Sequence, residues 1–214
     1  IKLDKVADVL GYTSRIRPIS DDEPLTFEQM NQGYGYVLYS RHFNQPISGT
    51  LAIPGLRDYA VIYIDGEKVG ELNRNTQTYE MEIEVPFNAT LQILVENMGR
   101  INYGREIVHN TKGIISPVTI AGQPISGNWE MYQLPMSEVP DFTKLGNNNV
   151  FKNGSSQANR LKDCPVLYEG TFTLNETGDT FIDMEAWGKG IIFVNGHNIG
   201  RYWKVGPQQT LYIP

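Results

Sequence analysis

Paired carboxylates are the side chains of this sequence that could carry out hydrolysis, because glycoside cleavage and general acid–base catalysis both need two such groups. Three groups occur: Asp21-Asp22-Glu23, Glu80 with Glu82 and Glu84, and Asp179 with Asp183. In the second group the glutamates alternate with apolar residues, which places all three carboxylates on one face of a strand. A charged row of this kind is typical of a solvated surface. The sequence therefore identifies no catalytic residue.

Other reaction chemistries also lack their usual motifs. The sequence contains neither a Gly-x-Ser-x-Gly nucleophile motif nor a glycine-rich phosphate loop before a helix. Its single cysteine, Cys164, cannot form an internal disulfide, and His42, His109 and His197 do not have the spacing of zinc ligands. We therefore expect no metal and no cofactor.

Charge and hydropathy exclude two classes of partner. The net charge of -6 and the isoelectric point of about 5.1 argue against nucleic acid and anionic lipid, which require clustered Lys and Arg. No apolar run approaches the roughly 20 residues that span a bilayer. We expect neither a nucleic-acid nor a membrane partner, and these features leave the cellular compartment open.

Aromatic side chains flank a predicted hairpin near the end of the chain, and aromatic rings beside polar groups are a common way to stack on sugars. The candidates for such stacking are Trp187, Tyr202 and Trp203. The alternative is that the tryptophans fill the core of a small domain, and the high average burial of large aromatic residues favours this alternative.

A second candidate binding segment follows a predicted core strand. Two glycines, Gly99 and Gly104, frame it, and a single turn projects Arg100, Asn102 and Tyr103. This grouping could present polar and aromatic contacts to a ligand, although a purely structural turn has the same residue types.

These candidates must be positioned by strands, because the chain is rich in short strand-like segments. Residues 36–39, 59–64, 91–95 and 191–194 are β-branched and aromatic and are bounded by Gly, Pro, Asn or Asp. Helical patterns are confined to residues 3–10 and 138–145, and the polar residues 146–159 are predicted to form a surface loop. The fold class is predicted to be all-β.

The chain also repeats itself internally. Residues 62–70, with Asp65-Gly66 at their centre, match residues 192–200, with Asn195-Gly196 at the same place. Both dipeptides are typical of type I′ hairpin turns, which need positive φ at two consecutive residues. The offset of about 130 residues has the size of a domain, so we predict two tandem β-sandwiches.

The boundary between the two sandwiches is predicted near residue 120, where Pro and Gly cluster. The first sandwich would comprise residues 1–120, including an N-terminal linker segment, and the second would comprise residues 121–214. The alternating residues 128–134 are predicted to form the strand that opens the second sandwich.

Several of these segments together resemble a known family. The sequence GYVLY at residues 35–39, VENMGRINYG at 95–104, KGI at 112–114, the residues 187–196 and the residues 200–214 are similar, in this order, to the C-terminal region of family 35 β-galactosidases. The resemblance covers nearly the whole chain from Gly33 onward.

The resemblance implies that the two sandwiches are galactose-binding-like jelly rolls and that a catalytic TIM barrel belongs to the same parent chain. In this family the barrel carries two glutamates that hydrolyse β-galactosides with retention, and neither of their motifs occurs here. The aromatic residue of the Arg-x-Asn-aromatic-Gly loop packs on the bound galactose in the family, and Tyr103 occupies that position. Arg100 and Asn102 would hold the loop or meet the barrel. A secreted, periplasmic or lysosomal-type compartment is also implied.

Three functions remain open on this basis. The first is a non-catalytic region that scaffolds the barrel, contributes to the rim of the galactoside site and is inactive alone. The second is an autonomous carbohydrate-binding module that uses Trp187, Tyr202 and Trp203. The third is a purely structural interface for oligomerisation or domain packing.

Overall fold

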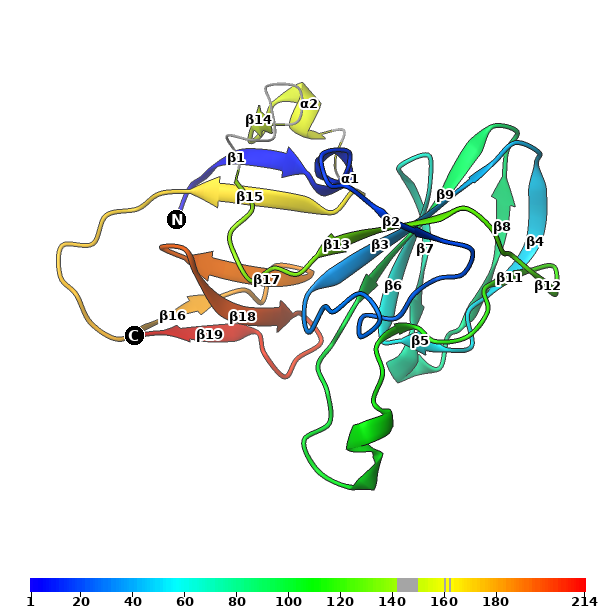
Figure 1. The fold of residues 1–214 in the computed structure, drawn as a ribbon. Coiled ribbons are helices and arrows are strands. Elements are labelled where there is room, and N and C mark those ends of the chain that lie inside the picture. The colour runs from blue at the N-terminus through cyan, green and yellow to red at the C-terminus, as the bar shows by residue number, and fades with distance from the viewer. Residues whose placement is uncertain (142–149, 160, 162) are drawn as a thin grey trace.

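The computed structural model describes residues 1–141, 150–159, 161 and 163–214. It confirms the all-β prediction, because strands are its dominant element and they form several antiparallel sheets. Figure 1 shows two β-sandwich modules that lie side by side. In the described part of the chain, no helix is long and apolar enough to cross a membrane.

The first module packs a six-stranded sheet against a four-stranded sheet. The six-stranded sheet has the order β2 (Ile19–Asp21), β13 (Trp129–Leu134), β3 (Tyr36–Phe43), β9 (Ala89–Glu96), β6 (Tyr59–Ile64) and β7 (Glu67–Asn73). The four-stranded sheet has the order β12 (Gln123–Pro124), β11 (Thr119–Ile120), β4 (Ile47–Ala52) and β8 (Glu80–Val85). A short pair, β5 (Leu56–Arg57) with β10 (Gly113–Ile114), and the 3-10 turns η1 (Arg74–Thr76) and η2 (Arg105–His109) complete it. Glu80, Glu82 and Glu84 are exposed on β8, as predicted.

The second module consists of three smaller sheets. Strand β1 (Leu3–Asp8) lies between β14 (Val150–Lys152) and β15 (Val166–Gly170). The hairpin of β17 (Lys189–Val194) and β18 (His197–Trp203) lies beside the pair of β16 (Thr180–Asp183) and β19 (Thr210–Ile213). The short helices α1 (Val9–Thr13) and α2 (Ser156–Asn159) flank the first of these sheets.

The four central strands of the six-stranded sheet, β13, β3, β9 and β6, contribute buried side chains to both of its faces, which explains their largely apolar sequences. In β3, Val37 and Tyr39 belong to the core of the first module, whereas Leu38 points to the opposite face. On that opposite face Leu38 and Leu94 form a second core with Val9 and with Ile191 and Phe193 of the second module. The two modules are therefore joined by an apolar contact as well as by the connecting segments of the chain.

The two predicted hairpins are confirmed and have the same geometry. Asp65 and Gly66 have φ values of 49° and 82°, and Asn195 and Gly196 have values of 49° and 84°. Each hairpin also has an irregularity at the same place in its register, two to three residues before the turn. The internal repeat is therefore structural as well as sequential.

The prediction that residues 128–134 open the second sandwich is wrong. Strand β13 pairs with β2 and β3 inside the six-stranded sheet, and Trp129 lies in the core of the first module with no exposed surface. Alternation identified the strand correctly, but it cannot identify the partner strand.

The N-terminal segment also differs from the prediction. Residues 3–8, expected as a helix within a linker, form the central strand β1 of a second-module sheet, and α1 begins only after Asp8. The Asp8 side chain accepts a hydrogen bond from the N–H of Leu10 at 2.9 Å and so caps that helix. We propose that residues before about 19 belong to the second module, that residues from about 19 to 135 form the first module, and that the residues after 135 complete the second.

Two further expectations concern the region after residue 135. Half of the predicted helix at 138–145, residues 142–145, lies outside the described residues, and residues 138–141 are not helical. The predicted loop at 146–159 does so only in its first part, since its remainder contains β14, which pairs with β1, and α2.

Candidate functional site

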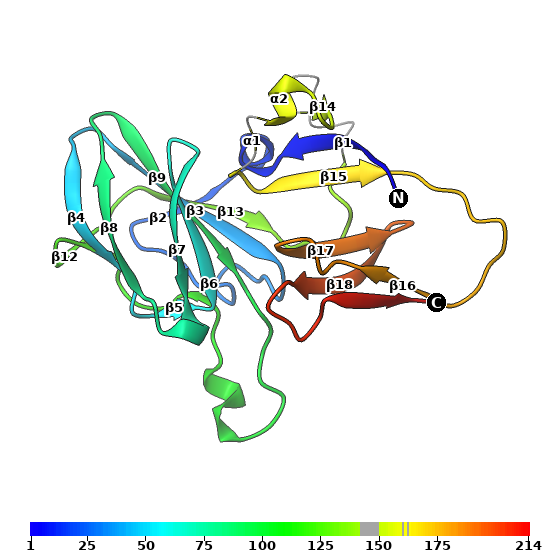
Figure 2. The same cartoon turned by 180° about the vertical axis from the view of Figure 1, so that it is seen from behind.

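The segment that carries Arg100, Asn102 and Tyr103 projects from the first module. Figures 1 and 2 show it as an excursion between β9 and β10 that carries η2 and extends away from both modules. Residues 99–109 are all exposed, and the Tyr103 side chain retains 90% of its accessible surface. We call residues 97–112 the projecting loop. Its tip, around Tyr103, offers an exposed aromatic ring, whereas Asn97 and Lys112 at the two ends of its stem are buried.

A buried carboxylate holds both ends of the stem. Asp58, which is 4% exposed, accepts a hydrogen bond from the backbone N–H of Met98 at 3.0 Å. The Nζ of Lys112, at the other end of the loop, lies 2.6 Å from the same carboxylate, and Lys112 is only 2% exposed. Arg74 contributes a third contact at 2.9 Å. Burial lowers the pKa of Lys112, and the neighbouring Asp58 carboxylate opposes that shift.

Arg100 also supports the stem and does not extend into solvent as a ligand contact. Its guanidinium donates to the carbonyl oxygen of Gly33 and forms an ion pair with Glu28. Glu28 also accepts the backbone N–H of Lys112 at 3.0 Å. Asn102 is exposed near the tip, beside Tyr103. Of the three predicted residues, Arg100 therefore holds the loop, and Asn102 and Tyr103 face outward.

The Glu28 contacts predict a measurable titration. Burial raises the pKa of Glu28, but hydrogen bonds from Arg100 and from the Lys112 N–H outweigh burial and bring the pKa below 4.5, the ordinary glutamate value. These contacts therefore contribute stability above pH 4.5 and are lost as the pH falls through the folded-state pKa. We expect the amide proton resonance of Lys112 to titrate with a midpoint below pH 4.5 in NMR spectra. Glu28→Gln should abolish this titration, and a midpoint above 4.5 would contradict the assignment.

The three aromatic candidates for sugar stacking do not form one open face. All three are half-buried. Trp187 packs edge-on against Tyr168 with ring centroids 5.2 Å apart, and Tyr202 lies over the paired Gly190 on the neighbouring strand. The ring of Trp203 is covered by Lys189, whose Nζ lies 4.1 Å from the ring centroid, and contacts Tyr59 of the first module. These rings therefore serve packing within and between the modules.

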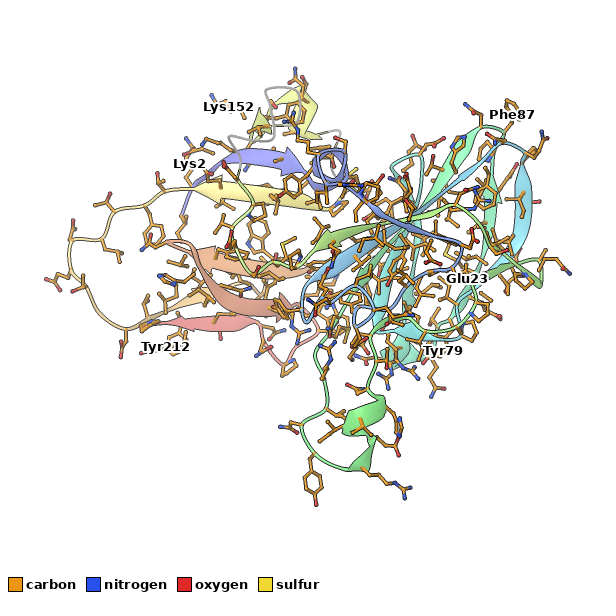
Figure 3. The ribbon with its side chains drawn as sticks, in the orientation of Figure 1. Lys2, Glu23, Tyr79, Phe87, Lys152 and Tyr212 are labelled. Atoms are coloured by element: carbon orange, nitrogen blue, oxygen red, sulfur yellow. The ribbon has the colours of Figure 1, made fainter. Side chains whose placement is uncertain are left out.

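The exposed aromatic pair of the second module was missed in the sequence. Phe181 and Tyr212 are opposite each other on β16 and β19, with ring centroids 5.6 Å apart, and they are 67% and 49% exposed. Figure 3 shows Tyr212 at the end of the second module that lies farthest from the first. The alternation of Phe181 with Ile182 and of Leu211 with Tyr212 was the available signal for this face.

Two cations of the second module surround a buried carboxylate at the end of β9. Glu96 is 2% exposed, and its Oε2 lies 2.9 Å from the Nζ of Lys189. Arg201 approaches Oε1 at 3.7 Å and donates to the carbonyl oxygen of Asn97 at 3.1 Å. Burial raises the pKa of the Glu96 carboxyl, while Lys189 and Arg201 act in the opposite direction. A cavity of about 160 Å³ opens beside these groups between the modules, lined in part by Met98, Trp203 and Gln208.

Comparisons with known proteins identify both modules. Residues 24–135 match the family model described as the first all-beta domain of beta-galactosidase, and residues 165–214 match its galactose-binding domain. The first match includes β13, in agreement with the sheet pairing. The resemblance drawn from the sequence motifs is thereby confirmed.

Individual relatives agree with the family models. The chain is 36% identical over 197 residues to the beta-galactosidase of Xanthomonas manihotis. This alignment covers 92% of this chain and 31% of the relative. The chain is 37% identical to beta-galactosidase 1 of Dictyostelium discoideum, with coverage of 89% and 30%. It is 36% identical to the beta-galactosidase of Mus musculus, with coverage of 100% and 35%. The chain thus spans about a third of the length of the curated relatives that it matches.

Proposed function

This chain belongs to the β-galactosidase family, and from that premise we propose that its two sandwiches complete the sugar site of a β-galactosidase by presenting Tyr103 to the bound galactoside. The chain comprises the all-β, non-catalytic domains of such an enzyme. The catalytic carboxylates would then belong to a barrel in the same parent protein.

The chemistry assigned to the parent is retaining hydrolysis of terminal β-galactosides. One barrel carboxylate would attack the anomeric carbon, and a second would protonate the leaving oxygen and then activate water. The contribution of this chain is binding: an aromatic ring can pack on the apolar face of a galactose ring and exclude water from one side of the site. Scaffolding of the barrel by the same surface is part of the proposal.

The observation that carries the proposal is the contrast between the tip and the stem of the projecting loop. Tyr103 is 90% exposed, the highest value among the large apolar side chains in the described part of the chain, so its ring is free to contact a partner. The stem beneath it is fixed by Asp58 and Lys112, both nearly fully buried. A fixed stem lets the ring be presented to a partner with little loss of conformational entropy on binding.

We expect Tyr103→Ala in the intact parent enzyme to lower kcat/KM roughly tenfold, about 1.4 kcal/mol, because the ring contact with the sugar is lost. Most of the loss should be a higher KM, since Tyr103 is not assigned to bond breaking. Steady-state hydrolysis of a chromogenic β-galactoside measures both constants. The melting temperature should not change, because the side chain packs on little of its own module.

Two variants control this experiment. Tyr103→Phe keeps the ring and should retain most of the affinity. Phe87→Ala removes another exposed aromatic side chain, 67% exposed, from the opposite end of the first module and should behave like the wild type (Figure 3). Normal kinetics in Tyr103→Ala would rule out a role of the loop in the sugar site.

A further inference from the structure

The stem of the projecting loop is held from the second module as well as from the first. Arg201 on β18 donates to the carbonyl oxygen of Asn97, the first residue of the loop. The Asn97 side chain in turn accepts the N–H of Gly99 at 2.9 Å and donates to Gly33 at 3.0 Å. A Cβ placed on Gly99 would lie 3.1 Å from Nη2 of Arg201, so the guanidinium lies directly against the loop.

Charge fixes the guanidinium in this place. Glu96, one residue before the loop, pairs with Lys189 on the neighbouring strand β17 and is approached by Arg201. Lys189 is itself enclosed by Trp203 and Tyr59, whose ring centroids lie 4.1 and 5.3 Å from its Nζ. Because Glu96 is almost fully buried, removal of either cation would leave a poorly compensated charge at the module interface.

We propose that Arg201, supported by Lys189, is a positioning residue through which the second module sets the orientation of the loop that carries Tyr103. This inference rests on the proposed function of Tyr103. It assigns to the second module a role in substrate affinity without requiring that the module touch the sugar.

The reason is that the loop has little packing of its own. Residues 99–109 are exposed, so the direction of the tip depends on the stem contacts at residues 96–98, 100 and 112. A loop that loses one of the contacts at its base samples more orientations, and binding must then restrict them at a cost in free energy. Loss of Arg201 should therefore weaken substrate binding through Tyr103 even though Tyr103 is unchanged.

The first test compares Arg201→Gln with Lys204→Gln in the intact parent enzyme. Lys204 lies on the surface immediately after β18, and its replacement should leave kinetics unchanged. We expect Arg201→Gln to raise KM about three- to tenfold with kcat within twofold of the wild type. Arg201→Lys keeps the positive charge beside Glu96 and should recover part of the loss, and it also provides a second folded variant if Arg201→Gln is unstable.

A double-mutant cycle separates positioning from general stability. If Arg201 acts through Tyr103, Arg201→Gln should have no further effect on KM in a Tyr103→Ala background. An equal rise in KM in both backgrounds would show that Arg201 acts elsewhere and would overturn the inference.

Hydrogen exchange of the intact enzyme gives a readout that does not depend on activity. The amides of Met98, Gly99 and Ile101 donate hydrogen bonds to the side chains of Asp58, Asn97 and Asn110, at 3.0, 2.9 and 3.1 Å respectively. They should exchange faster in Arg201→Gln than in the wild type or Lys204→Gln. Unchanged exchange overturns the inference whatever Tyr103 does, whereas normal kinetics in Tyr103→Ala with faster exchange in Arg201→Gln would refute only the proposed sugar contact.

Discussion

Replacing Asp58 with alanine will lower the free energy of unfolding by about 3–5 kcal/mol, because it leaves a buried cation without its counter-charge. Lys112 is 2% exposed, and its ammonium group forms an ion pair with the Asp58 carboxylate. The same change removes the acceptor of the Met98 N–H and the partner of Arg74. Urea denaturation followed by intrinsic fluorescence measures the loss as a lower midpoint.

Two comparisons make this expectation specific. Asp4→Ala removes an exposed aspartate, whose ion pair with Lys2 spans 3.6 Å, and should change the free energy of unfolding by less than about 0.5 kcal/mol. Lys112→Met in the Asp58→Ala background should recover part of the loss, because it removes the uncompensated charge and fills the same volume with apolar atoms. If Asp58→Ala is no more disruptive than Asp4→Ala, the buried ion pair does not stabilise the first module.

The local structure of the chain could be predicted because it depends on neighbouring residues. Asp65-Gly66 and Asn195-Gly196 specify their turns by backbone conformation alone, and both adopt positive φ. The glutamates of β8 alternate with apolar residues, and that alternation alone identifies the outward face. The all-β class follows from such segments repeated along the chain.

Strand partners could not be predicted in the same way. Strands β1 and β13 each enter a sheet of the module to which the sequence order did not assign them. Their pairing depends on contacts such as that of Val6 with Tyr168, which lie far apart in the chain. Period-2 alternation shows which residues point inward, but the same pattern fits either sheet.

In the candidate site, too, features that depend on neighbouring residues could be predicted, and features that depend on distant residues could not. Glycines and polar residues at 99–104 identified the tip of the projecting loop, including Tyr103, from its own sequence. The buried carboxylates Asp58 and Glu96 gave no local signal, because their cationic partners come from distant strands and loops. Burial of Trp203 was favoured by the size of its side chain, but the residues that cover it, Lys189 and Tyr59, could not be identified from the sequence.

The position of β13 in the core of the first module predicts a second large loss of stability, on replacement of Trp129. Trp129→Ala should lower the free energy of unfolding by about 3–5 kcal/mol, since the ring has no exposed surface and its loss leaves a cavity that the sandwich cannot fill. The Nε1 of Trp129 also donates to the carbonyl oxygen of Ile125 at 2.9 Å, and this buried acceptor would lose its partner. Urea denaturation measures the total, with Trp187→Ala as the matched control because Trp187 is only half-buried.

The strands in which Trp129→Ala accelerates hydrogen exchange distinguish the observed pairing of β13 from the predicted domain boundary near residue 120. If β13 belongs to the six-stranded sheet, hydrogen exchange in Trp129→Ala should accelerate first in β3, its neighbour, and in β9 beyond it. The hairpin of β17 and β18 contacts that sheet only through its outer face, so its amides should keep their protection at low urea concentrations. The opposite order, with this hairpin opening before β3, would place Trp129 in the second module. Because a core substitution loosens first the strands that pack on the missing side chain, the exchange pattern reports the sheet to which Trp129 belongs.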